Sequence, residues 1–254
     1  MTRVIKIGGR PQADPTLGPA LAAGWADGSG GLVLVHGGGD EVSTLQAALG
    51  GSTTFVNGRR VTTEKDIDLV RMALSGSANK RLVSSLVQNG VHAVGLSGED
   101  AALIAASPMD AERLGYVGVP RTVNVAFLRH LLSGGYLPVI SPVSRDGSGT
   151  LGAALNVNGD DAAAAIAVAL GAAELLLVAD VEGVMREGRV ITDLTPDGAR
   201  QLVEDGTVVG GMQAKLQAGL TAVAGGVPCV RISDIAAITD PRRGTMLRAI
   251  GDLS

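Results

Sequence analysis

The sequence predicts an α/β fold, with a mostly parallel central sheet and helices on both of its faces. Short apolar runs alternate along the chain with amphipathic helical patterns, which is the order of elements in βαβ units. Runs such as Leu32 to Val35 are apolar throughout, as expected of strands that a parallel sheet buries on both faces. The 37 glycines and the low aromatic content of 2% favour tight turns and a core of small aliphatic residues.

Length and composition limit the class of protein. A chain of 254 residues, 46% of them hydrophobic, fits one large domain over residues 1–254 made of two closely packed lobes. The net charge of -4, without a run of Lys and Arg, argues against nucleic acid as the main partner. The single cysteine, Cys229, excludes an internal disulfide and fits a reducing cytosol, so we expect a cytoplasmic protein.

We expect neither a signal peptide nor a membrane span. The first strand begins within a few residues of Met1, which leaves no room for a signal sequence. The stretch 162–179 is strongly apolar, but Gly171 and Glu174 divide it, so we interpret it as a helix followed by a buried strand.

Two turns that join a strand to glycines organise the chain. His36-Gly37-Gly38-Gly39 ends a buried strand and opens a helical pattern. Lys6-Ile7-Gly8-Gly9 is a second copy, again a strand that ends in glycines, now with a lysine. Such glycines let the backbone approach a ligand closely, with N–H groups that point at an anion. The alternative is a pair of tight turns whose glycines serve packing alone.

The other elements are assigned from periodicity and turn signals. We expect strands over 2–8, 32–35, 92–96, 137–141, 175–178 and 227–232, and helices over 15–26, 40–49, 64–89, 124–133, 162–170, 197–204 and from 210. Residues 98–122 have no clear period and are assigned only a hairpin or an excursion. Asn57-Gly58 predicts a hairpin over 55–62 that presents two arginines, either as a clamp for a carboxylate or as a solvated tip.

Two further segments have competing interpretations. The centre of the helix 64–89, Ala73 to Ala78, has small side chains, so it is interpreted as a dimer contact, with packing inside the subunit as the alternative. Residues 147–152 match the G-x-G-x-x-G pattern of dinucleotide sites, but residues 142–146 separate them from the preceding strand and no helix follows. We therefore predict a polar hairpin there and not a nicotinamide site.

The glycine turns, two lysines and one aspartate suit phosphoryl transfer. That reaction requires the donor and acceptor to be aligned and the charge on the moving group to be neutralised. Lys6 and Lys215 would stabilise this charge from opposite sides, and Asp160 would hold the two ammonium groups in place. Fixed dipoles would come from the N–H groups of Gly8, Gly9, Gly38 and Gly39.

In combination these motifs resemble the amino-acid kinase family over nearly the whole chain, residues 3–247. The motifs are Lys6-Ile7-Gly8-Gly9, His36-Gly37-Gly38-Gly39, Asn57-Gly58-Arg59-Arg60-Val61-Thr62, Asn156-Val157-Asn158-Gly159-Asp160, Asp180-Val181-Glu182-Gly183-Val184 and Gly211-Met212-Gln213-Ala214-Lys215. Within the family, the resemblance is closest to the enzymes that phosphorylate N-acetyl-L-glutamate in arginine biosynthesis.

The resemblance implies that ATP phosphorylates the side-chain carboxylate of N-acetyl-L-glutamate, which gives an acyl phosphate and ADP. It implies catalytic roles for Lys6, Lys215 and Asp160. The acetylglutamate site that it implies consists of Gly38, Gly39, Asn156 and Arg60, with Arg60 on the α-carboxylate. The nucleotide site that it implies consists of Gly8, Gly9, Asp180, Val181, Glu182, Gly183, Val184, Met185, Thr207, Val208, Val209 and Gly211.

The resemblance also implies an open αβα sandwich and a homodimer. Residues 1–155 would form the acceptor lobe and residues 156–254 the nucleotide lobe, with one sheet shared between them. Mg²⁺ would arrive with ATP, held mainly by phosphates and water, without a metal site built from protein side chains.

The chain departs from the family pattern at two arginines. Arg10 follows Gly9 where the family more often has a small or apolar residue, and Arg59 replaces a usual leucine. The arginine that binds the substrate carboxylate is therefore Arg59 or Arg60, and we prefer Arg60. Arginine-inhibited members carry an additional helix before the first strand, which this sequence lacks, so we expect a dimer that is insensitive to arginine.

Alternative functions stay open at this point. One alternative is a sister kinase for N-acetyl-α-aminoadipate or a carrier-linked homologue. Its substrate is longer than N-acetyl-L-glutamate by one methylene, which is worth only about 1–3 kcal/mol of discrimination. A non-catalytic ligand sensor on the same fold is the alternative outside enzymes, and the retained Lys6, Lys215 and Asp160 argue against it. We interpret His36 as a strand-end residue held by a backbone hydrogen bond, because a carboxylate acceptor has no proton for a general base to remove near pH 7.

Overall fold

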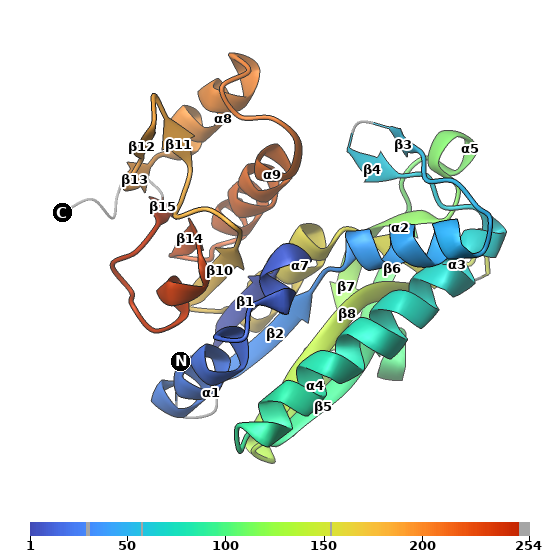
Figure 1. Cartoon of the computed structure of the whole chain (residues 1–254), viewed down its shortest axis with the longest axis horizontal. Helices are drawn as coiled ribbons and strands as arrows, with labels where there is room; N and C mark the ends of the chain where they lie inside the picture. Colours follow the sequence, from blue (N-terminus) through green and yellow to red (C-terminus); the bar gives the residue numbers. More distant parts are fainter. Residues whose placement is uncertain (29–30, 57, 153, 249–254) are drawn as a thin grey trace.

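One large mixed sheet runs through the computed structural model, which describes residues 1–28, 31–56, 58–152 and 154–248 (Figure 1). Its strands are β1 (Arg3–Ile7), β2 (Leu32–His36), β5 (Ala93–Gly98), β6 (Ile104–Pro108), β7 (Val117–Val123), β8 (Leu137–Asp146), β9 (Ala154–Val157), β10 (Glu174–Val178), β13 (Asp193–Leu194), β14 (Val230–Ser233) and β15 (Thr245–Leu247). Two small hairpins lie outside the sheet, β3 (Phe55–Val56) with β4 (Arg59–Arg60) and β11 (Met185–Arg186) with β12 (Arg189–Val190).

Helices connect most of these strands. The α-helices are α1 (Leu17–Asp27), α2 (Gly39–Ala48), α3 (Glu64–Val70), α4 (Asn79–Gln88), α5 (Ala111–Leu114), α6 (Val125–Ser133), α7 (Gly159–Leu170), α8 (Pro196–Glu204) and α9 (Gly210–Ala224). Short 3-10 turns are η1 (Arg10–Ala13), η3 (Asp100–Ala102) and η4 (Ile235–Ile238), and η2 (Arg71–Ala78) is a π-helical segment. Among the described helices, none combines the length and the apolar character needed to span a bilayer.

The centre of the sheet is parallel. The strand order is β13-β15-β14-β10-β1-β2-β8-β6-β7-β9, and β5 also pairs with β8. Every pairing among β14, β10, β1, β2, β8 and β5 is parallel. Antiparallel pairs occur toward the margins, between β14 and β15, β6 and β7, and β8 and β9. The prediction of a mostly parallel α/β sheet is therefore confirmed.

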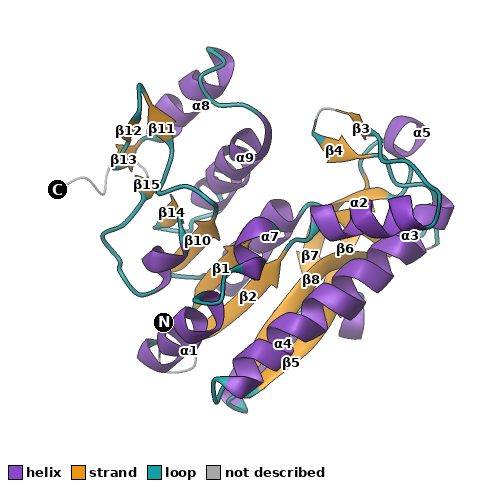
Figure 2. Ribbon diagram, in the orientation of Figure 1, coloured by secondary structure: helices purple, strands orange, loops and turns teal. Residues whose placement is uncertain are grey.

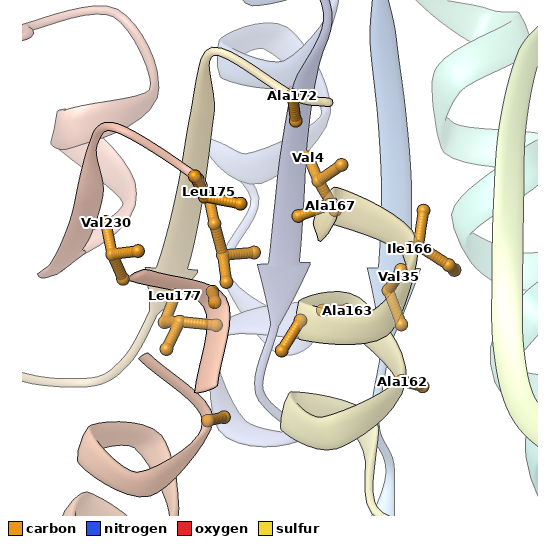
Figure 3. Close-up of a cluster of buried hydrophobic side chains, with 14 of the residues drawn as sticks. Val4, Val35, Ala162, Ala163, Ile166, Ala167, Ala172, Leu175, Leu177 and Val230 are labelled. Atoms are coloured by element: carbon orange, nitrogen blue, oxygen red, sulfur yellow. The ribbon is translucent and has the colours of Figure 1, made fainter. Parts of the chain in front are cut away.

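Both faces of the central strands are buried, because successive side chains of a strand point to opposite faces. In β1, Val4 belongs to the core that lies under α7 and α9, whereas Ile5 belongs to the core under α1 and α4. The sheet thus lies between helices, with α7 and α9 on one face and α1 and α4 on the other (Figure 2). Figure 3 shows how closely α7 packs, with Ala167 against Val4 and Leu175 nearby, since alanine lets the helix approach the sheet.

The long helix predicted over 64–89 is present as α3, η2 and α4, which follow one another without a break. Its small-residue centre is the π-helical segment, and there Ala73, Leu74 and Ala78 are buried inside the subunit. Gly76 and Ser77 are exposed. Packing within the subunit thus accounts for half of this segment, and the dimer contact stays a prediction.

Two sequence-based assignments change in detail. β8 continues to Asp146, so the assumption that residues 142–146 separate the glycine pattern from a strand is wrong. The polar hairpin is nevertheless correct, because β9 follows and pairs antiparallel with β8 where a nucleotide fold would need a helix. Residues 98–122 contain the antiparallel pair β6 and β7 with α5 between them, in agreement with the predicted hairpin or excursion. Asn57, in the predicted 55–62 hairpin, lies outside the described residues.

Candidate active site

A pocket of about 230 Å³ opens at the carboxyl ends of β1 and β2. Open α/β sheets bind ligands at this edge, where loops leave the strands. The pocket brings together seven of the residues predicted from sequence, namely Lys6, Gly9, Gly38, Gly39, Arg60, Asn156 and Asp160. Segments far apart in the chain thus converge on one cavity.

A buried carboxylate between two lysines is the main charge arrangement of the site. Lys6 Nζ lies 2.9 Å from Asp160 Oδ1, and Lys215 Nζ lies 3.4 Å from Asp160 Oδ2. Lys6 is only 6% exposed and Asp160 only 4%. These three side chains come from β1, the first turn of α7 and the second turn of α9, so packing of both helices on the sheet sets their separation.

Burial and the neighbouring charges act in opposite directions on these groups. Burial alone would raise the pKa of the Asp160 carboxyl, but Lys6 and Lys215 together outweigh it and hold that pKa below its usual value. Burial and repulsion from Lys6 lower the pKa of the Lys215 ammonium. The N-terminus of α7 also favours a negative charge on Asp160. A carboxylate with a lysine on each oxygen is therefore the stable state at neutral pH.

Asn158 explains why Asp160 is free to bind the lysines. Its Oδ1 accepts hydrogen bonds from the backbone N–H of Asp160 at 2.8 Å and of Asp161 at 3.4 Å, which caps α7. The cap is therefore supplied by the asparagine, and the two aspartates that follow it bind basic side chains. Asn156 donates from Nδ2 to Thr62 Oγ1 at 3.0 Å at the pocket wall.

The two glycine turns come together beside Lys6. The Gly37 N–H donates to Ile7 O at 2.9 Å, which joins the end of β2 to the end of β1. Gly38 has a φ of 150°, and a Cβ there would lie 2.8 Å from Leu74 Cδ2. Position 38 therefore requires glycine for its backbone conformation, while the contact with η2 meets only the end of the Leu74 side chain.

Arg60 presents its guanidinium to the pocket without a carboxylate partner among the described residues. Nη2 donates to Gly39 O at 2.7 Å and to Ser43 Oγ at 2.8 Å, and Nη1 donates to Thr53 Oγ1 at 3.0 Å. The guanidinium carbon also lies 5.1 Å from the centre of the Phe55 ring. Burial lowers the pKa of Arg60. The group is thus held by neutral hydrogen-bond acceptors, and among the described residues Asp66 and Asp40 act on its charge only at longer range than an ion pair.

Arg59 differs because its charge is already paired. Its Nη2 lies 2.8 Å from Asp161 Oδ2, a contact between the β3–β4 hairpin and the start of α7. Burial raises the pKa of Asp161 even with Arg59 beside it. Of the two adjacent arginines, Arg60 is therefore the one without an ion-pair partner in the described part of the chain.

His36 is fully buried and belongs to the scaffold. Its Nδ1 donates to Gly37 O at 2.8 Å, while Nε2 accepts from Asn79 Nδ2 at 3.1 Å. Burial lowers the pKa of His36 to about 4, so the ring is neutral at pH 7. Both ring nitrogens are occupied by protein groups, which agrees with the interpretation of His36 as a residue held by a backbone hydrogen bond.

Of the residues predicted for the nucleotide, only Gly9 lines this pocket. Asp180 pairs with Arg10 at 2.8 Å across the ends of β10 and β1. Val184 is fully buried and Val208 is 5% exposed, so neither side chain is available to a ligand and only their backbone could contribute. In contrast, Val181, Met185 and Val209 are exposed apolar side chains.

Three residues in contact with the site were not found from the sequence. Gln12 bonds to both glycine turns, Asn79 fixes His36, and Gln46 supports Arg60. Each acts through a hydrogen bond to a residue distant in the chain, and such contacts leave no periodic signal. Asp161, by contrast, had a sequence signal, because the two asparagines and two aspartates of residues 156–161 exceed what one helix cap needs.

A family model and individual relatives both match this chain over most of its length. The model of the Amino acid kinase family matches residues 1–234. The acetylglutamate kinase of Chloroflexus aurantiacus is 42% identical over 239 residues, which cover 93% of each chain. That of Geobacillus kaustophilus is 44% identical over 201 residues, 79% of this chain and 77% of the relative.

Solved structures share the fold. A Streptococcus mutans UA159 protein superposes with a TM-score of 0.87 at 30% identity, covering 98% of both chains. The N-acetylglutamate synthase of Neisseria gonorrhoeae, crystallised with coenzyme A and N-acetyl-glutamate, gives a TM-score of 0.81 at 27% identity over 97% of this chain and 59% of that one. Giardia lamblia carbamate kinase, at 15% identity and a TM-score of 0.71, shares the fold alone.

The family match and the relatives named above define the class of protein as a phosphotransferase of the kinase type. The family match and the curated relatives agree, and the chain belongs to the amino acid kinase family.

The His36 environment predicts a pH-dependent stability. Because the pKa is about 4 in the folded protein against 6.5 for a free histidine, the unfolded chain binds a proton in this window that the folded protein does not. The free energy of unfolding should therefore fall as pH drops from 6.5 to 4, by about 3 kcal/mol. His36→Asn should flatten this dependence and retain most activity, since an amide can still donate to Gly37 O. Denaturant titrations at several pH values would measure it, and an equally steep fall in the variant would contradict it.

Proposed function

We propose that this protein transfers the γ-phosphoryl group of ATP to the side-chain carboxylate of N-acetyl-L-glutamate, within arginine biosynthesis. The curated relatives that are 39–44% identical all carry the name acetylglutamate kinase. The observation that carries the proposal is the pocket lined both by the Lys6–Asp160 pair and by Arg60, an arginine without an ion-pair partner among the described residues. A dicarboxylate acceptor matches two separate cationic groups.

In this proposal the residues act mainly by position and charge. A carboxylate oxygen of the acceptor attacks the γ-phosphorus, a P–O bond forms, and the bond to the bridging oxygen of ADP breaks. Lys6 and Lys215 stabilise the charge on the moving phosphoryl group, and Asp160 holds their ammonium groups at a fixed separation. Arg60 binds the α-carboxylate of the acceptor, and Gly38, Gly39 and Asn156 complete the acceptor site.

The nucleotide would occupy the side of the site formed by residues 180–185 and 207–211. Val181 is 37% exposed, Met185 41% and Val209 69%, so each offers apolar surface for contact with a flat base. In this division residues 1–155 serve the acceptor and residues 156–254 the nucleotide, on one shared sheet.

Mg²⁺ is proposed to enter with ATP and to neutralise phosphate charge. Within the described residues, no group of three or more His, Cys, Asp or Glu side chains is arranged to hold a metal ion. Both oxygens of the one buried carboxylate at the site are occupied by lysines. Phosphate oxygens and water are then the ligands that fit.

A second copy of the chain is the proposed partner. The helix formed by α3, η2 and α4 exposes Met72 and Val87, which are 54% and 56% accessible. Covering apolar side chains on a long helix favours self-association. Sedimentation of the 25.5 kDa chain should give the mass of a dimer, and a monomer at micromolar concentration would contradict this.

The deciding experiment measures ADP release with Mg-ATP and N-acetyl-L-glutamate, and traps the acyl phosphate with hydroxylamine. N-acetyl-α-aminoadipate, glutamate and no acceptor serve as comparisons. Lys6→Ala and Lys215→Ala should each lower kcat by roughly 10²–10³-fold, because each removes a cation that acts on the transition state. Turnover only with N-acetyl-α-aminoadipate would identify the protein as the sister kinase. ATP binding without any turnover would identify a ligand sensor instead.

Substitutions of the two arginines of the β3–β4 hairpin should change the KM for the acceptor to different extents. Arg60→Gln should raise the KM for the acceptor by about 10–100-fold, because it removes a charged hydrogen bond, and leave the KM for ATP unchanged. Arg59→Gln is the matched neighbour, and it should have the smaller effect because Asp161 already pairs with Arg59. Steady-state kinetics with each substrate varied would measure both. A larger effect at Arg59 would reverse the assignment.

A further inference from the structure

The side-chain amide of Gln12 joins the two glycine turns of the site. Gln12 lies in η1, and its Nε2 donates to Gly8 O at 3.0 Å and to Gly37 O at 2.9 Å. Both hydrogens of the amide group are thereby used. Its Oε1 is buried without a partner among the described residues. A flipped amide would set Oε1 against two carbonyl oxygens, so the hydrogen bonds fix the orientation of the group.

The planarity of the peptide bond carries this effect to the pocket. In a trans peptide unit the C=O and the following N–H point in opposite directions. Holding the carbonyls of Gly8 and Gly37 toward Gln12 therefore aims the N–H groups of Gly9 and Gly38 the other way, and both of these residues line the pocket. Among the described residues neither N–H has an acceptor. Two backbone N–H groups therefore point away from Gln12 and have no acceptor in the described part of the protein.

The donors and the catalytic lysine converge on a small volume. A Cβ on Gly9 would lie 3.7 Å from Gly38 Cα and 3.9 Å from the backbone nitrogens of Gly38 and Gly39. A Cβ on Gly37 would lie 3.9 Å from Lys6 Nζ and 4.0 Å from Gly9 N. Backbone N–H groups and an ammonium so close together form a nest for an anion with several oxygens.

The turn that contains Gly8 depends most on Gln12. The carbonyl of Gly37 also accepts from His36 Nδ1 at 2.8 Å, whereas Gln12 supplies the hydrogen bond to the carbonyl of Gly8. The peptide unit between Gly8 and Gly9 is flanked by two glycines, which restrict its rotation least of all residues. Without Gln12 this unit is free to turn its N–H away from the pocket.

We propose that Gln12 is a positioning residue that sets the N–H groups of Gly9 and Gly38 on the oxygens of the transferring phosphoryl group. This inference rests on the proposed phosphoryl transfer. Preorganised N–H groups stabilise charge that develops in the transition state, so the effect should fall on kcat more than on substrate binding.

The test compares Gln12→Leu with the same change at an exposed position. Gln12→Leu should lower kcat by about 10-fold or more, since small misplacements of catalytic donors are costly, with both KM values within about twofold of wild type. Gln12→Glu keeps the shape but sets a carboxylate against two carbonyl oxygens, so its kcat should fall further. Gln88→Leu, at the exposed end of α4, is the control and should leave kcat unchanged. Calorimetric unfolding of each variant measures stability.

A second readout does not depend on turnover. ADP with aluminium fluoride imitates the transferring phosphoryl group, and its affinity should weaken in Gln12→Leu by more than the affinity for ADP alone. A kcat of Gln12→Leu within twofold of wild type, or equal losses for both nucleotide complexes, would overturn the proposal. If Gln12→Leu is unstable, Gln12→Met, which keeps the length of the side chain but not its amide, decides by the same criteria. Wild-type protein that phosphorylates no acceptor would contradict the proposed function, and the aluminium fluoride comparison would still decide the role of Gln12.

Discussion

The arrangement of the site depends on the carboxylate of Asp160, buried between two ammonium groups. Two lysines so close in a medium of low dielectric would repel each other, and each would lose its hydration. One carboxylate balances one of the charges and leaves the site with a net positive charge, which suits an anionic ligand. The same contacts connect a central strand, β1, to the helices α7 and α9 on one face. The packing of α7 and α9 on the sheet therefore also sets the alignment of the three charges.

Most of the fold was predictable from the sequence because the central strands are apolar on both faces. Residues such as Val4, Ile5 and Val33 go to two different cores, and this leaves a continuous apolar run that is easy to recognise. The second half of β8 gave no such signal, since Ser144 and Asp146 are polar and yet buried. Asp146 is instead stabilised by the loop that follows it, where Ser148 and backbone N–H groups lower its pKa to about 2 against the effect of burial. The π-helical centre of the long helix was equally hidden, because its small side chains predict close packing but not the pattern of backbone hydrogen bonds.

The site was predictable where chemistry requires a residue type at a fixed place along the chain. The lysine at the end of β1, the glycines of both turns and the polar start of α7 are of this kind. The supporting residues Gln12, Asn79 and Gln46 were not predictable, because they act across the fold on partners remote in sequence. Val184 and Val208 show the opposite case. The sequence predicts them as nucleotide-binding residues, but their side chains are buried in the core.

The position of β1 in the sheet has a consequence for folding. β1 lies between β2 and β10, and Arg3 on β1 bonds to Glu174 on β10 across 171 residues of sequence. Closing so long a loop costs chain entropy before any pairing repays it, and parallel pairings of high sequence separation form slowly. The β1–β2 pair can form from local contacts, but Lys6 meets Asp160 and Lys215 only once the distant strand and helices have docked. Phosphotransferase activity during refolding should therefore appear only after this long-range docking, and not with the formation of the first strands.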